Sequence, residues 1–156
     1  MDAITARELV TAVSGKLIKG NENEFFTGIC TDSRIFEEKE VFFALKGETS
    51  DGHKFIPMAV DKGCRLCVIS DEKWIEGVDE CTFISVEDTL AALQVLTKWY
   101  LDKIAVKKIA VTGSVGKTST RDMVYYILSE KYKTGRPIKN YNSDVGIPLT
   151  VSKFSS

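Results

Sequence analysis

The sequence lacks any long apolar run, because the longest ones, such as Val41 to Leu45, fall far short of the ~20 residues that a membrane-spanning helix requires. It also lacks an excess of charge of either sign. Its 21 lysines and arginines face 22 aspartates and glutamates, which leaves a net charge of −1. This balance excludes bulk attraction to nucleic acid or to an anionic membrane surface, so any anion-binding site must be local.

Proline is scarce as well, with three residues, and 10% of the chain is aromatic, a composition that excludes disorder. No cationic segment followed by an apolar one marks the amino terminus, so we expect no signal peptide, no membrane insertion and a cytoplasmic protein. A chain of 156 residues has the length of roughly one domain. It buries ~70% of its unfolded surface and needs no disulfide or structural metal.

Cysteine occurs four times, at Cys30, Cys64, Cys67 and Cys81. Cys64 and Cys67 form a Cys-x-x-Cys pair, a spacing found in redox and zinc sites. The surrounding apolar residues predict instead a buried strand, on which these two side chains would point to opposite faces. We therefore expect reduced structural thiols.

Helix signals occur at three places in the first two thirds of the chain. Thr5 to Glu8 has capping-box spacing and predicts a short helix that Gly15 ends. A second helix is expected over 53–60, where Pro57 is tolerated only near the first turn. A third begins after a capping-box-like segment, 85–88. Its predicted core face comprises Leu90, Leu93, Leu96 and Tyr100.

Apolar segments between these helices predict strands, and two polar loops, 31–34 and 46–52, follow two of them. Strands that alternate with helices indicate an α/β fold. The expected strands span 25–30, 41–45, 65–69 and 82–85.

The pattern changes at Lys107. An apolar strand is expected over 108–112, then a tight turn, then a helix from Lys117 onward. We expect a boundary near residue 86, which divides the chain into a small α/β domain, 1–86, and the start of a parallel-sheet domain, 87–156. The core residues predicted for the last helix are Met123, Val124, Ile127 and Leu128.

The turn before Lys117 is the most informative segment. A strand that enters a glycine turn at a helix start directs several backbone N–H groups into one concavity, where the helix dipole and a lysine add positive charge. Thr118 offers a hydroxyl of the kind that holds phosphate-bound Mg²⁺. The simpler alternative is a strand–turn–helix with a lysine at the surface. It does not account for Gly-Lys-Thr at the start of the helix, directly after the strand and the turn. The predicted nucleotide-binding residues are Gly113, Ser114, Val115, Gly116, Lys117, Thr118 and Ser119.

Residues 112–120 resemble the nucleotide loop of the Mur ligase superfamily, whose enzymes join an amine to a carboxylate with ATP during synthesis of the cell-wall precursor peptide. The segments 31–34, 41–47 and 51–55 resemble the uridine-nucleotide domain that two branches of this superfamily share. Residues 140–150 favour the branch that adds D-alanyl-D-alanine over the branch that adds the third amino acid of the peptide.

The resemblance implies a peptide-bond-forming ligase of peptidoglycan precursor synthesis that uses ATP and Mg²⁺. The carboxylate of UDP-N-acetylmuramoyl-tripeptide would become an acyl phosphate and accept D-alanyl-D-alanine. Lys117 and Thr118 would act in catalysis, Lys117 on the β- and γ-phosphates and Thr118 on Mg²⁺. The implied substrate-binding residues are Ser33, Arg34, Lys46, Gly47, His53, Asn140 and Asn142.

Each of these substrate residues also has a simpler interpretation. Asp32 to Arg34 is an ordinary solvated turn, Asn140 and Asn142 suit turns, and His53 suits packing at a helix start. Enzymes of the family have three domains, and this chain reaches a short way into the second. We therefore expect an amino-terminal fragment that binds the nucleotide sugar without turnover and has no obligate protein partner. Three alternatives stay open: the ligase of the same family that adds the third amino acid, an unrelated P-loop phosphoryl-transfer enzyme, and a non-catalytic nucleotide-sugar-binding module.

Overall fold

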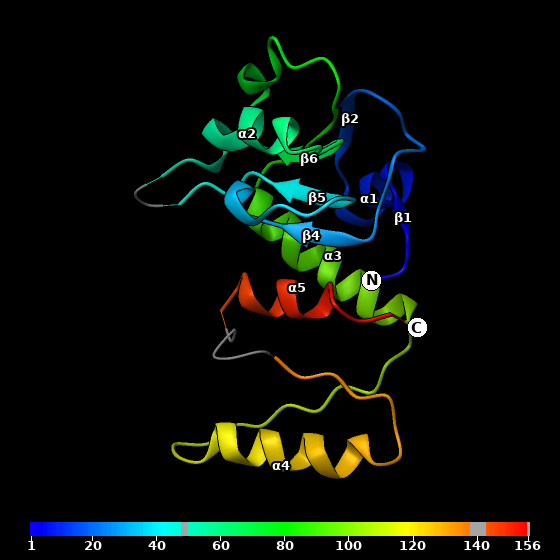
Figure 1. Cartoon of the computed structure of the whole chain (residues 1–156), viewed down its shortest axis with the longest axis vertical. Helices are drawn as coiled ribbons and strands as arrows, with labels where there is room; N and C mark the ends of the chain where they lie inside the picture. The colour runs from blue at the N-terminus through cyan, green and yellow to red at the C-terminus, as the bar shows by residue number, and fades with distance from the viewer. Residues whose placement is uncertain (48–49, 138–142, 156) are drawn as a thin grey trace.

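The structure, a computed structural model, describes residues 1–47, 50–137 and 143–155 (Figure 1). Its main feature is a five-stranded sheet in the order β2-β7-β6-β5-β4, in which β4 to β7 run parallel and β2 runs antiparallel to β7. A separate antiparallel pair joins β1 and β3. The strands are β1 (Ile4–Thr5), β2 (Lys16–Lys19), β3 (Phe25–Phe26), β4 (Gly28–Cys30), β5 (Glu40–Phe43), β6 (Leu66–Ile69) and β7 (Thr82–Ser85).

The α/β fold class and most of the expected strands are confirmed, and Thr82–Ser85 has the predicted bounds. The single strand expected over 25–30 is wrong, because the chain divides at Thr27 into β3 and β4, which belong to different sheets. The Thr27 N–H donates to the Lys39 carbonyl at 2.8 Å, outside both ladders. The strand β2 was not expected, since its Lys-Leu-Ile-Lys sequence is too short to show a period.

Three helices and three 3₁₀ turns accompany the sheet. The helices are α1 (Ala6–Val13), α2 (Ile56–Asp61) and α3 (Thr89–Lys103). The 3₁₀ turn Ser33–Ile35 follows β4, Gly52–Phe55 precedes α2, and Glu72–Ile75 follows β6. The capping box at Thr5 and Glu8 is confirmed by reciprocal hydrogen bonds of 3.2 and 3.0 Å. Pro57 lies in the first turn of α2, as expected.

The end of α1 corrects one prediction. Ser14, and not Gly15, takes the left-handed conformation that ends the helix, with φ at 53°. Gly15 is needed for another reason, because a Cβ at this position would lie 2.9 Å from Ile84 Cγ2. The glycine thus allows the chain to pass close to β7.

The parallel strands are buried on both faces, as continuous apolar runs predict. Val41 and Phe43 face a core shared with α1 and α3, whereas Phe42 faces a second core shared with α2. The helix α3 buries Leu93, Leu96 and Tyr100 as predicted, while Leu90 is only partly buried.

The last third of the chain holds α4 (Lys117–Ser129) and α5 (Gly146–Val151). The short helix α5 packs against α3 and β4, and α4 lies at the end of the molecule opposite the sheet (Figure 1). Residues 108–112 form no strand, and α4 has no buried residue, with Met123 and Ile127 at 64% and 72% exposure. Both expectations are therefore wrong for this structure. A strand needs a hydrogen-bonded neighbour, and none of the described strands lies beside 108–112.

The four cysteines are free and buried, as expected of structural thiols, but the expectation that Cys64 and Cys67 point to opposite faces is wrong. Cys64 lies before β6 and does not follow the alternation of the strand, because the chain has just turned at Gly63, whose φ is +95°. Its Sγ atom lies 3.6 Å from that of Cys67, on the same face of the sheet. None of the described helices is both long and apolar enough to span a bilayer.

Candidate functional site

The carboxyl ends of β4, β5 and β6 lie next to one another at one edge of the sheet, because these strands are parallel neighbours. Loops that leave this edge are the usual ligand-binding position in open α/β sheets. Residues 31–34 follow β4, residues 44–47 follow β5, and Ser70 follows β6. The sheet order thus brings together segments that are far apart in the sequence.

The loop after β4 presents a guanidinium group on a capped turn. Asp32 caps the 3₁₀ turn by accepting from the Arg34 N–H at 3.0 Å, and its carboxylate accepts from Nε and Nη2 of Arg34 at 2.9 and 2.7 Å. These hydrogen bonds lower the pKa of Asp32 to about 2. The Arg34 side chain is 81% exposed, so its fork is available to a ligand.

Two residues contact the turn that carries Arg34, and they differ in exposure, since Ser33 is buried and Lys62 is exposed. Ser33 is buried, and its hydroxyl donates to Met58 Sδ at 3.2 Å, so it points into the protein. Lys62, at the end of α2, donates from Nζ to the Arg34 carbonyl at 2.6 Å. Sequence reasoning missed Lys62, which lies 28 residues from Arg34 and has no motif of its own.

The loop after β5 is closed by backbone contacts. The Gly47 N–H donates to the Ser50 carbonyl at 2.9 Å, and the Gly52 N–H donates to the Leu45 carbonyl at 2.8 Å. A Cβ at Gly52 would lie 2.6 Å from that carbonyl oxygen, so the close approach requires glycine. Lys46 is exposed at the start of this loop.

His53 fastens the loop to the sheet. Its ring is 1% exposed, with Nδ1 2.6 Å from Asp51 Oδ1 and Nε2 accepting from the Ser70 N–H at 2.9 Å. Because Nε2 accepts, the proton lies on Nδ1 and is donated to Asp51. Both ring nitrogens are occupied within the protein, so the imidazole joins the loop after β5 to the end of β6.

The turn before α4 contains the two glycines of the expected phosphate-binding loop, both with positive φ. Gly116 caps the helix with φ at +79°, a left-handed conformation that favours glycine, and Gly113 has φ at +149°. The Lys117 Nζ donates to the Gly113 carbonyl at 2.5 Å, so the ammonium group lies over the turn. Residues 112–120 are all exposed, Thr118 among them. The exposed amides, the ammonium group and the hydroxyl are a donor set that fits a triphosphate with its Mg²⁺.

The structure thus divides the expected site residues into two groups. Residues after β4 and β5 share one edge of the sheet, whereas the turn before α4 lies toward the other end of the molecule (Figure 1). Asn140 and Asn142 lie outside the described residues. The edge group comprises Ser33, Arg34, Lys46, Gly47 and His53.

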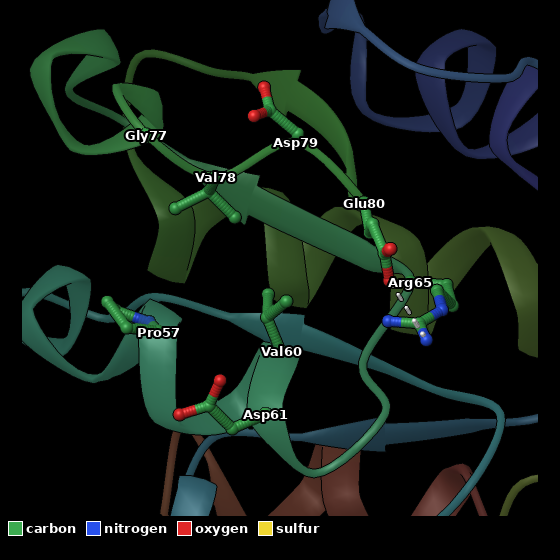
Figure 2. Close-up of a pocket in the computed structure, with 8 residues that line it drawn as sticks. All are labelled: Pro57, Val60, Asp61, Arg65, Gly77, Val78, Asp79 and Glu80. Carbon is green, nitrogen blue, oxygen red and sulfur yellow. Dashed lines mark ion pairs between the residues drawn. The ribbon is translucent and has the colours of Figure 1, made fainter.

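A third feature lies at the opposite edge of the sheet. An open hollow of about 420 Å³ lies between α2 and the segment that leads into β7. Figure 2 shows Arg65 and Glu80 side by side at one end of it, joined by an ion pair of 3.6 Å. None of the expected site residues that the structure describes lines this hollow.

Comparison with known proteins defines the class of this chain. Residues 25–101 match the Mur ligase family, catalytic domain, and residues 111–156 match the Mur ligase middle domain. Together these segments take up most of the sequence. The chain belongs to the Mur ligase family.

Within that family, the relatives found include D-alanyl-D-alanine-adding enzymes. The UDP-N-acetylmuramoyl-tripeptide–D-alanyl-D-alanine ligase of Bacillus subtilis is 37% identical over 148 residues, which cover 94% of this chain and 32% of the relative. A diaminopimelate-adding ligase of Cytophaga hutchinsonii is 35% identical over 132 residues, which cover 83% of this chain and 27% of the relative.

Solved structures agree with these sequence relatives. A MurF structure from Acinetobacter baumannii superposes with a TM-score of 0.86 at 32% identity and covers 99% of this chain and 34% of that one. The MurF ligase of Thermotoga maritima, solved in complex with ADP, superposes with a TM-score of 0.71 at 28% identity, over 82% of this chain and 29% of that one. The chain spans about a third of the length of these relatives.

Proposed function

We propose that this chain is part of an ATP-dependent ligase that adds D-alanyl-D-alanine to UDP-N-acetylmuramoyl-tripeptide. Its described residues bind the uridine diphosphate portion of that substrate. The observation that carries the proposal is the placement of Arg34 and Lys46 on adjacent loops at the carboxyl edge of the parallel strands. The identity to MurF enzymes supports the choice of substrate.

Arg34 is the main diphosphate ligand in this proposal. Its Nε and Nη2 are paired with Asp32, and the other N–H donors of the exposed guanidinium can meet diphosphate oxygens. Lys46 and Lys62 place two further cations near the same edge. Ser33 and His53 support the site from the interior of the protein. Ser33 lies under the turn, and His53 holds the Gly47 loop against β6.

The turn at 113–119 is proposed to hold ATP. Lys117 would leave the Gly113 carbonyl and pair with phosphate oxygens, the loop amides would donate to the phosphates, and Thr118 would hold Mg²⁺. ATP supplies the phosphoryl group that turns the substrate carboxylate into a reactive acyl phosphate, and Mg²⁺ neutralises phosphate charge. Asn140 and Asn142 stay substrate-binding candidates by resemblance alone.

The location and the domain division are part of the same proposal. A protein that consumes ATP and a nucleotide sugar works in the cytoplasm, where both are supplied. The division into 1–86 and 87–156 stays a prediction. The helix α3, which follows residue 86, packs its buried face on the same core as β5 and β6.

Two variants that serve as controls for each other test the proposal. Calorimetry with UDP-N-acetylmuramoyl-tripeptide should show Arg34→Ala weakening binding by ~10–100-fold, the loss expected for charge-assisted hydrogen bonds. Lys117→Ala should keep this affinity and lose binding of ATP with Mg²⁺. Unchanged substrate affinity in Arg34→Ala, or equal losses in both variants, would contradict the assignment of the two sites.

A second candidate is the ligase that adds the third amino acid, favoured by the 35% identity to a diaminopimelate-adding enzyme. The two ligases take acceptors of different length. We expect the chain to bind the UDP-N-acetylmuramoyl-tripeptide more tightly than the corresponding dipeptide. The reverse preference would favour this second candidate.

A further inference from the structure

Three buried cysteines meet on the α2 face of the sheet. Cys64 precedes β6, Cys67 lies within it, and Cys81 precedes β7, and none of the three is more than 4% exposed. The Cys67 Sγ lies 3.6 Å from that of Cys64 and 3.5 Å from that of Cys81, and all three sulfurs lie within 4.8 Å of one another. Within the described part of the chain, no other group of three or more metal-ligating side chains is arranged in this way.

We propose that Cys64, Cys67 and Cys81 form a three-sulfur site for a thiophilic metal cation, of the class that includes Zn²⁺ and Cd²⁺. Sulfurs that hold Zn²⁺ at ~2.3 Å in tetrahedral directions lie ~3.8 Å apart. The two measured separations, 3.6 and 3.5 Å, are within a few tenths of an ångström of that value. Thiolates prefer such soft cations over Mg²⁺, so this site differs in chemistry from the ATP-binding turn.

The local backbone explains why the three sulfurs converge. The register pairs Cys67 with Phe83, and Thr82 donates its N–H to the Arg65 carbonyl at 2.8 Å, so Cys81 and Cys64 flank matching positions of β7 and β6. Cys64 is held by its own N–H, which donates to the Ala59 carbonyl at 3.0 Å. The starts of β6 and β7 and the end of α2 therefore fix the positions of the three cysteines.

Binding exchanges protons for the cation without any redox step. Three S–H bonds ionise, three sulfur–metal bonds form, and three protons pass to solvent, so Zn²⁺ or Cd²⁺ leaves a net charge of −1 on the site.

Residues next to the cluster in the sequence line the hollow in Figure 2, where Arg65 follows Cys64 and Glu80 precedes Cys81. Asp61 and Asp79 add two exposed carboxylates to its lining, and Asp79 is paired with Lys19 at 2.7 Å.

Cys30 is a natural control, because it belongs to the same buried core but stands apart from the cluster. Its Sγ donates to the Asp32 carbonyl at 3.1 Å, and burial raises its pKa to about 12. A thiol of this kind does not bind a cation by itself.

The test uses the reduced, metal-free 156-residue chain and Cd²⁺ as the probe. Titration should give one Cd²⁺ per chain, followed by the ultraviolet sulfur-to-cadmium absorption. Cys67→Ser and Cys81→Ser should each weaken binding by more than the ~10–100-fold that loss of an outer-shell partner costs. Cys30→Ser should leave it unchanged.

A second measurement does not depend on how the variants fold. The ¹¹³Cd resonance of the unmodified chain should report a three-sulfur environment. Absence of the absorption in the unmodified chain, a resonance typical of oxygen ligands, or equal loss of binding in Cys30→Ser would overturn the proposal. It stands apart from the ligase function, and its failure would leave that function unaffected.

Discussion

His53 shows how one side chain can join two segments at the carboxyl ends of the parallel strands. It is the single histidine of the sequence, and both of its ring nitrogens are bonded inside the protein, to Asp51 and to the Ser70 N–H. The loop after β5 and the end of β6 are therefore joined through one buried imidazole.

Replacing this histidine should destabilise the whole protein. His53→Ala removes a buried ring and leaves the Ser70 N–H, which is half-buried, without its partner, so we expect the free energy of unfolding to fall by ~1–3 kcal/mol. Urea unfolding measures this, with the exposed neighbour Lys54→Ala as a control that should stay within ~0.5 kcal/mol. Equal stability of the two variants would mean that the His53 hydrogen bonds contribute nothing.

The lowered pKa of Asp32 is the clearest electrostatic feature of the proposed binding site. Its pairing with Arg34 lowers its pKa to about 2, and NMR titration of the side-chain carboxyl should show this value. In Arg34→Ala, the pKa should return toward the ordinary ~3.9. The folded pKa lies below the unfolded one, so the stabilisation is complete above pH ~4 and is lost as the pH falls through about 2.

Asp79 is the control for this titration. Its carboxylate is paired with Lys19 at 2.7 Å, and this hydrogen bond lowers its pKa as well. Both residues are distant from Arg34 in the sequence. Its titration should be the same in the unmodified chain and in Arg34→Ala. A parallel shift of both carboxyls would indicate a general structural change.

At the scale of elements, α3 and α4 are of similar length but differ in how they are capped and packed. The side chain of Asp88 caps α3 by accepting from two backbone N–H groups at 2.7 and 3.0 Å, and α3 buries a full face. The first turn of α4 follows Gly116, which offers no side-chain cap, and this helix buries no residue. A helix of this length without packing is marginal in water.

Hydrogen exchange should separate the two helices. We expect backbone amides in α4 to exchange close to the rate of an isolated helix, and those in α3 to approach the protection of the global unfolding reaction. Mass spectrometry of peptides from 89–103 and 117–129 measures both in one sample, so α3 is the internal reference. Equal protection of the two helices would show that α4 has packing contacts that this structure lacks.

At the scale of the whole molecule, Tyr100 joins the two ends of the chain. Its hydroxyl accepts from the Asp2 N–H at 2.9 Å and donates to the Phe154 carbonyl at 2.8 Å. The segment after α5 is thereby held on α3, beside the first strand. The fold closes through contacts that span almost the entire sequence.

Tyr100→Phe removes both hydrogen bonds and keeps the buried ring. We expect a loss of ~1–2 kcal/mol in the free energy of unfolding, together with faster exchange of α5 amides. Denaturant unfolding and exchange of 146–151 measure the two effects. The exposed Tyr132→Phe is the matched control, and a loss of the same size in that variant would contradict the role of the Tyr100 hydroxyl.

Several features of this fold and site could be predicted from local sequence. The capping box at Thr5, the strand Thr82–Ser85 and the Gly-Lys-Thr turn depend on residues within a few positions of one another, so their patterns are visible in the chain. The approach of Lys62 to Arg34 could not be predicted, because 28 residues separate them and only the sheet order brings them together. The cysteine cluster was missed for a related reason, since a turn at Gly63 breaks the strand alternation.

The sequence by itself determined the family, the α/β class, the residues after β4 and β5, and the Gly-Lys-Thr turn, since each of these depends on short-range pattern and residue chemistry. Only the tertiary structure decided which of those residues share an edge, that the His53 ring faces inward, and that three cysteines meet. The physical reason is that strand order and turn geometry set distances between remote residues. Those distances follow from the packing of the sheet and its helices as a whole.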